Sequence, residues 1–150
     1  MKIFLAADHN GFELKNEVRA YLERAGIAVE DMGDEKLDPA DDFQIYAARA
    51  VTALLGSDDA DPRAILICGS GQGMMIAANR FKGIRAGLGW SVEAARGIRN
   101  DEDSNVLALP SQILNENRSL AHQIIDTWLE TPFAGATRYI RRNKALDTLA

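Results

Sequence analysis

Short apolar runs alternate with segments of helical periodicity along this chain, and that alternation restricts its possible folds more than any other feature. Each run is five or six residues long, and the segments between them repeat apolar residues every three or four positions. The clearest run, residues 64–68, reads Ala-Ile-Leu-Ile-Cys and is bounded by Arg63 and Gly69. A strand that is apolar on both faces is typical of the centre of a parallel sheet covered by helices.

The whole pattern predicts five strands with helices between them. Strands are expected at residues 3–7, 27–32, 64–68, 84–88 and 105–109. Helices are expected at residues 14–25, 43–54, 74–81, 92–99 and 121–129, and the tail from residue 136 onward is expected to be helical. This order predicts an α/β fold, a parallel sheet between two helical layers. No repeat, low-complexity segment or long linker divides the chain, so we expect a single domain over residues 1–150.

Composition and charge exclude several classes of partner. The 150 residues are 47% hydrophobic and 26% charged, which is ordinary for a soluble globular protein. A net charge of −5 argues against nucleic acid, because phosphate-backbone binding needs an excess of Lys and Arg. No apolar run approaches the ~20 residues that cross a bilayer, so no membrane partner is expected. The one cysteine cannot form an internal disulfide, which favours a cytoplasmic protein.

Metal and cofactor chemistry also has little support in the composition. One Cys and two His cannot assemble a zinc site of the usual kind, so we expect neither a metal nor another cofactor. One of those two, His122, lies among apolar residues of the helix expected at residues 121–129, and we interpret it as part of the scaffold.

The segment after the central strand is the strongest candidate for a ligand site, because open parallel sheets bind ligands beyond the carboxyl ends of their strands. It reads Gly-Ser-Gly-Gln-Gly over residues 69–73. Alternate glycines let backbone N–H groups face an anion without obstruction by side chains. The spacing matches neither the dinucleotide-binding fingerprint nor a Walker A loop. The segment indicates an anion-binding loop or, alternatively, a tight turn without a ligand.

Cys68 immediately precedes this loop. Taken alone, a single cysteine is most often a small buried hydrophobic residue. Beside the N–H groups that begin a helix, however, a thiol meets a positive partial charge that favours the thiolate. A thiolate next to donors that stabilise an oxyanion is a competent base for proton abstraction.

Two other pairs of residues are weaker candidates. Asp8 and His9 follow the first strand, where they could contact sugar hydroxyls and a phosphate or could form an Asx turn beside a surface histidine. Arg138 and Arg142 are four residues apart, so on a helix they share one face and could hold one phosphate. The alternative is that both arginines are merely solvated.

Several segments together resemble the type B ribose-5-phosphate isomerase and galactose-6-phosphate isomerase family over nearly the whole chain. They are residues 8–15, 65–74, 76–79, 83–86 and 105–109, and the match around Cys68 is the most specific. The resemblance implies a flavodoxin-like, Rossmann-type αβα sandwich that is usually a homodimer, and in some cases a larger assembly, with active sites between subunits. It also implies a metal-free proton transfer between C1 and C2 of a small open-chain sugar phosphate through an enediolate.

The resemblance also suggests roles for individual residues. Cys68 matches the family's catalytic base, and the loop that follows it matches the one that stabilises the enediolate oxygen. The positions that match substrate-binding or phosphate-binding residues are Asp8, His9, Gly69, Ser70, Gly71, Gln72, Gly73, Arg138 and Arg142.

The chain departs from the family pattern at positions that open the sugar ring or bind the substrate. Asp101 stands where many members have the histidine that opens the furanose ring, which makes it our second catalytic candidate, and Glu102 replaces a substrate-binding asparagine. A local gap would instead put Arg99 at the histidine position. Gln112 stands where an arginine is common, so Gln112 and Glu102 are further substrate-binding candidates, and Tyr139 stands where a histidine is common.

Three functions therefore remain open at the level of sequence. The first is a ribose-5-phosphate isomerase that opens the ring with Asp101 or without help from the enzyme. The second is an isomerase of another sugar phosphate, such as a tetrulose phosphate or a hexose 6-phosphate. The third is a sugar-phosphate-binding protein with little catalysis.

Overall fold

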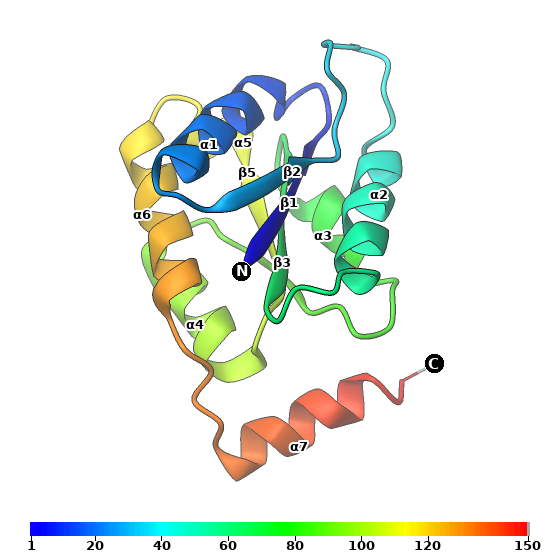
Figure 1. Ribbon diagram of the computed structural model, residues 1–150, viewed down its shortest axis with the longest axis vertical. Coiled ribbons are helices and arrows are strands. Elements are labelled where there is room, and N and C mark those ends of the chain that lie inside the picture. The colour runs from blue at the N-terminus through cyan, green and yellow to red at the C-terminus, as the bar shows by residue number, and fades with distance from the viewer. Residues whose placement is uncertain (150) are drawn as a thin grey trace.

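A five-stranded parallel sheet lies between two layers of helices in the computed structural model, which describes residues 1–149 (Figure 1). The strands are β1 (Lys2–Ala7), β2 (Ala28–Asp31), β3 (Pro62–Cys68), β4 (Ala86–Leu88) and β5 (Val106–Pro110). Their order is β2-β1-β3-β5-β4, and every pairing is parallel. The predicted αβα fold class is confirmed. Relative to the flavodoxin order 2-1-3-4-5, the last two strands are exchanged, so that β5 lies beside β3 and β4 forms an edge.

The helices follow the predicted stripes with shifted ends. They are α1 (Phe12–Arg24), α2 (Phe43–Leu55), α3 (Gln72–Ala78), α4 (Val92–Glu102), α5 (Ser111–Leu114), α6 (Arg118–Glu130) and α7 (Thr137–Leu146). The short helix α5 was not predicted. Helix α3 ends before the predicted residue 81 because of the Asn79 side chain. Its amide nitrogen donates to the Ala86 carbonyl and its amide oxygen accepts from the Ala86 N–H, at 2.9 Å each. These bonds turn the chain into β4.

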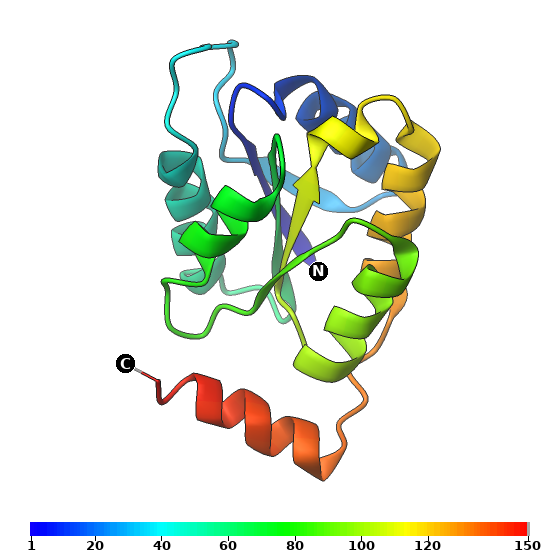
Figure 2. The same ribbon diagram turned by 180° about the vertical axis from the view of Figure 1, so that it is seen from behind.

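Each face of the sheet has its own apolar core. On β1, Ile3 and Leu5 point to the layer made by α1, α4 and α6, whereas Phe4 and Ala6 point to α2 and α3. Figure 1 shows these two layers on opposite sides of the sheet, and Figure 2 shows them from behind. The alternation follows from the two-residue period of a strand. Cys68 belongs to the face covered by α2 and α3.

Helix α7 lies apart from both layers, below the amino ends of the strands (Figures 1 and 2). Of its residues only Asn143 is buried, and the Asn143 amide donates to the Asp101 carbonyl at 3.4 Å. Just before α7, the Ala134 N–H donates to the Asn100 carbonyl at 3.0 Å. The last turn of α4 thus anchors α7. None of the helices in residues 1–149 is long and apolar enough to cross a membrane.

Candidate active site

Asp8 and Cys68 lie side by side at the carboxyl end of the sheet. Ala7 pairs with Ile67 in neighbouring strands, so the next residue of each strand reaches the same level. The Asp8 N–H donates to the Ile67 carbonyl at 3.2 Å. Asp8 and Cys68 are each only 5% exposed. Burial raises the pKa of Asp8, although a hydrogen bond of 3.1 Å from the Gly11 N–H to its carboxylate opposes that rise.

The loop from Gly69 to Gly73 depends on its glycines. Gly71 has a φ of 74°, and a Cβ there would come within 2.5 Å of the Leu88 side chain. A Cβ on Gly73 would come within 3.1 Å of the Phe43 ring. The Ser70 hydroxyl accepts from the Gln72 N–H at 3.3 Å. Gly71 therefore has a conformation that only glycine adopts without strain, and Gly73 leaves room for the Phe43 ring.

Side chains from other elements surround the same loop. A Cβ on Gly69 would lie 3.3 Å from the Gln112 amide nitrogen and 3.7 Å from the side chain of Asn10. The Gln112 N–H also donates to the Gly69 carbonyl at 3.0 Å. The structure thus places Gln112, one of the substrate-binding candidates, beside the loop, together with Asn10.

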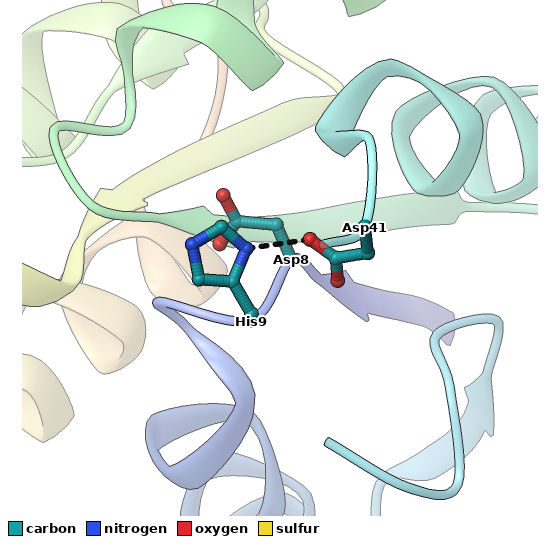
Figure 3. Close-up of side chains that lie close together, drawn as sticks. All are labelled: Asp8, His9 and Asp41. Carbon is teal, nitrogen blue, oxygen red and sulfur yellow. Dashed lines mark hydrogen bonds and ion pairs between the residues drawn. The ribbon is translucent and has the colours of Figure 1, made fainter. Parts of the chain in front are cut away.

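His9 forms a hydrogen bond at each ring nitrogen, and Figure 3 shows the one with Asp41. Its Nδ1 lies 2.6 Å from Oδ1 of Asp41, and its Nε2 lies 2.9 Å from the amide nitrogen of Asn10. The Asp41 side chain is 4% exposed, whereas that of His9 is 33% exposed. The hydrogen bond with Asp41 is the main cause that raises the pKa of His9.

Asp41 was missed by sequence reasoning. It lies 32 residues from His9, in the polar loop before α2, and no motif or periodicity distinguishes it from the loop's other carboxylates. The ligand atoms of Asp8, His9 and Asp41 lie within 4.8 Å of one another, close enough to hold a metal ion. From the composition no metal was expected, on the ground that one Cys and two His cannot form a zinc site of the usual kind. The group contains two carboxylates and one imidazole. Nδ1 of that imidazole is already hydrogen-bonded to Asp41.

The remaining candidates gather at the opposite end of the sheet. Glu102 ends α4, and its carbonyl accepts from the Arg85 side chain at 2.7 Å, next to the first residue of β4. The carboxylate of Asp101 accepts from the Asn100 amide at 2.7 Å. Arg138 lies on α7, where its hydrogen bond with Tyr139 and, to a smaller degree, the charge of Asp101 raise its pKa.

Arg142 lies one turn after Arg138 on the same helix, and both are exposed. The predicted site residues therefore form two groups, a carboxyl-end group around Cys68 and an amino-end group around Arg138. Helix α4, which runs from one end of the sheet to the other, is roughly 16 Å long. One chain alone does not bring the two groups together.

Two further residues that the sequence analysis considered, Arg99 and His122, have structural roles. Arg99, the alternative match to the ring-opening histidine, is 7% exposed, and its guanidinium donates to Asp103 at 2.8 Å and to the Ser104 carbonyl at 2.6 Å. His122 stacks on the Tyr21 ring at 3.9 Å between α1 and α6, as expected of a scaffold residue.

Comparison with known proteins gives one consistent result. The family described as Ribose/Galactose Isomerase matches residues 3–146. Ribose-5-phosphate isomerase B of Mycolicibacterium paratuberculosis is 35% identical over 150 residues, which cover 100% of this chain and 90% of that protein. The enzyme of the same name from Escherichia coli is 36% identical over 148 residues, covering 99% of this chain and 95% of that one.

Solved structures are similarly close. A ribose 5-phosphate isomerase from Thermotoga maritima superimposes with a TM-score of 0.91 and 43% identity, covering 99% of this chain and 98% of that chain. Ribose-5-phosphate isomerase B from Mycoplasma genitalium, solved with bound ribulose-5-phosphate, gives a TM-score of 0.90 and 33% identity over 98% of this chain and 94% of that one. The chain therefore belongs to the ribose/galactose isomerase family and is an aldose–ketose isomerase.

Proposed function

We propose that this enzyme interconverts ribose 5-phosphate and ribulose 5-phosphate without a metal ion, and that Cys68 is its base. The observation that carries the proposal is the position of Cys68, a buried thiol at the end of the central strand and at the start of a loop in which Gly71 has a positive φ and no room for a Cβ. The bound ribulose-5-phosphate of the Mycoplasma genitalium relative supports the choice of substrate.

The proposed reaction begins with the open-chain aldose. The Cys68 thiolate takes the proton from C2, the electron pair of that bond forms the C1–C2 double bond, and the carbonyl oxygen takes the negative charge. Backbone N–H groups of the glycine loop stabilise this oxygen. Return of the proton to C1 and transfer of the hydroxyl proton from O2 to O1 give the ketose. Asp8, His9 and Gln112 bind the sugar at the same end of the sheet.

The amino-end group requires a second copy of the chain. In the proposed homodimer, Arg138 and Arg142 of one copy hold the phosphate of a substrate bound to Cys68 of the other. The surface of α7 supports this arrangement, because the helix buries one residue of its own while Ile140 and Leu146 are 39% and 47% exposed. Helix α7 of one copy would reach the carboxyl-end group of the other.

Ring opening is assigned to Asp101 or to the unaided substrate. Asp101 lies beside Arg138 in the amino-end group, so it would enter the site with the phosphate-binding arginines of the second copy. A carboxylate there could take the proton of the anomeric hydroxyl. Glu102 would contact the sugar from the same turn.

A second candidate is the isomerisation of another sugar phosphate, such as a tetrulose phosphate or a hexose 6-phosphate. Gln112 at the glycine loop favours it, because the neutral amide stands where an arginine is common in the family. A neutral side chain at this position changes which hydroxyl or phosphate oxygen is bound.

A panel of sugar phosphates tests both candidates. The purified enzyme should convert ribose 5-phosphate faster than erythrose 4-phosphate or allose 6-phosphate, as measured by kcat/KM for formation of the ketose. A higher kcat/KM for the tetrose or hexose phosphate would show that this sugar phosphate, and not ribose 5-phosphate, is the preferred substrate. Absence of turnover on the whole panel, with binding of the phosphates retained, would mean that the substrate is a sugar phosphate outside the panel.

A further inference from the structure

The two ring nitrogens of His9 face different surroundings. Its Nδ1 faces Asp41, whose side chain is almost fully buried. Its Nε2 faces Asn10, which lies against Gly69 at the start of the glycine loop. The imidazole is therefore oriented with one nitrogen toward the protein and the other toward the loop where the substrate is proposed to bind (Figure 3).

We propose that Asp41 is a positioning residue, which holds His9 with its Nδ1–H directed to the carboxylate and its Nε2 directed to the substrate. This inference rests on the proposed function. A carboxylate that accepts from Nδ1 fixes both the tautomer and the orientation of an imidazole. In the neutral ring Nε2 then accepts the hydrogen bond from Asn10, and in the charged ring it becomes a second donor.

The charged groups around His9 all raise its pKa. The charged groups that act on the ring are Asp8, Asp38 and Asp41, all of them acidic, and each raises its pKa. Asp41 does so by direct contact, whereas Asp38 acts only through its charge. A protonated His9 would carry positive charge next to a site for an anionic phosphosugar.

The alternative is that Asp41 only tethers the loop before α2. Three variants separate the two roles. Asp41→Asn keeps an oxygen that can accept from Nδ1 but removes the charge, whereas Asp41→Ala removes both. Asp38→Asn is the matched control, since it removes one charge from the same loop and keeps the oxygen that accepts from the Ala40 N–H at 3.0 Å.

Kinetics is the first readout. With ribose 5-phosphate, Asp41→Ala should lower kcat/KM about tenfold, the loss expected for one charge-assisted hydrogen bond, mainly through a higher KM. Asp38→Asn should change kcat/KM less than twofold. In the pH profile of kcat/KM, the limb assigned to His9 should move to lower pH in Asp41→Asn. A tether would lower the melting temperature without moving that limb, and this result would overturn the proposal.

Nuclear magnetic resonance gives a second readout that does not depend on activity. The chain has two histidines, so in a His122→Gln background the imidazole signals belong to His9 alone. The midpoint of the His9 titration should fall toward the ordinary value of about 6.5 in Asp41→Asn. In Asp41→Ala the nitrogen signals should also lose the preference for a proton on Nδ1.

The two readouts distinguish the possible failures. If the wild-type enzyme does not isomerise ribose 5-phosphate, the proposed substrate is wrong, and the imidazole signals still test the contact between Asp41 and His9. If the midpoint and the tautomer of His9 do not change in the Asp41 variants, the positioning role is wrong. If they change while kcat/KM does not, Asp41 orients His9 without serving the reaction, and the proposal is again overturned.

Discussion

Cys68 and Arg138 lie at opposite ends of the same sheet. Cys68 is the last residue of β3, paired with Pro110 at the end of β5, whereas Arg138 lies on a helix anchored to the last turn of α4, beside the start of β4. A base and a phosphate clamp for one small sugar cannot be that far apart. If both act on one substrate, they come from two copies of the chain.

Mixing inactive variants tests this shared site. Cys68→Ala is mixed in equal amounts with the double variant Arg138→Ala/Arg142→Ala, after mild denaturation to exchange subunits. Half of the dimers are then mixed, and each has one intact site, so about a quarter of wild-type activity should return. The matched control mixes Cys68→Ala with Asp8→Ala, which lie in the same group, and should recover nothing. Equal recovery in both mixtures, or none in either, would contradict a site shared between copies.

Substitution of Cys68 tests the base. Cys68→Ala should lower kcat by at least about a hundredfold, because proton transfer by a positioned side chain contributes 10²–10⁴-fold. Binding of the phosphosugar, measured by calorimetry, should change little, since the phosphate clamp is intact. Cys68→Ser should be nearly as slow, because a hydroxyl is a far weaker acid than a thiol. A variant with near-normal kcat would rule out Cys68 as the base.

Arg142 is expected to bind the phosphate group itself. Arg142→Ala should weaken competitive inhibition by inorganic phosphate about tenfold, the loss of one charge-assisted hydrogen bond. Lys at this position should restore only part of it, because an ammonium lacks the guanidinium fork. Arg141→Ala is the control, since Arg141 carries the same charge about 100° around α7. An inhibition constant that is unchanged in Arg142→Ala, or equally raised in both variants, would place the clamp elsewhere.

Chelation tests the absence of a metal from the reaction. Dialysis against EDTA should leave kcat and KM unchanged, because the proposed chemistry uses a thiolate and backbone donors only. The experiment can contradict the proposal, because the ligand atoms of Asp8, His9 and Asp41 lie close enough together to hold a metal ion. Loss of activity in EDTA, restored by a divalent ion in wild type but not in Asp41→Ala, would instead identify that group as a metal site.

A comparison of Gly26 with Gly71 distinguishes the cost of backbone strain from the cost of a steric clash in the glycine loop. Gly26 and Gly71 have φ values of 76° and 74°, but a Cβ meets nothing within 4 Å at Gly26 and meets Leu88 at 2.5 Å at Gly71. Gly26→Ala should cost about 1–2 kcal/mol in the free energy of unfolding and leave activity unchanged. Gly71→Ala should cost more and also reduce kcat, because the loop must move. Equal losses of stability, measured in urea, would mean that the contact with Leu88 is unimportant.

Much of this protein could be predicted from local patterns in the chain. The run of residues 64–68 has to be a buried strand, because it is apolar on both faces, and Gly71 can adopt its positive φ because it lacks a Cβ. Cys68 and the glycine loop are contiguous, so their spacing alone places the thiol beside the backbone donors. Arg138 and Arg142 share a face for the same local reason, the period of a helix.

The features that could not be predicted from the sequence depend on contacts between distant segments. Asp41 meets His9 only because the loop before α2 folds back over the end of β1, and nothing in a polar loop marks which of its carboxylates will be buried. The exchange of β4 and β5 reflects how the strands pair through the backbone, which is the same for every residue type. The separation of Cys68 from Arg138 likewise follows from the direction of α4 across the sheet. Local periodicity specifies each element, whereas pairing and burial depend on the whole chain, and only the tertiary structure determines them.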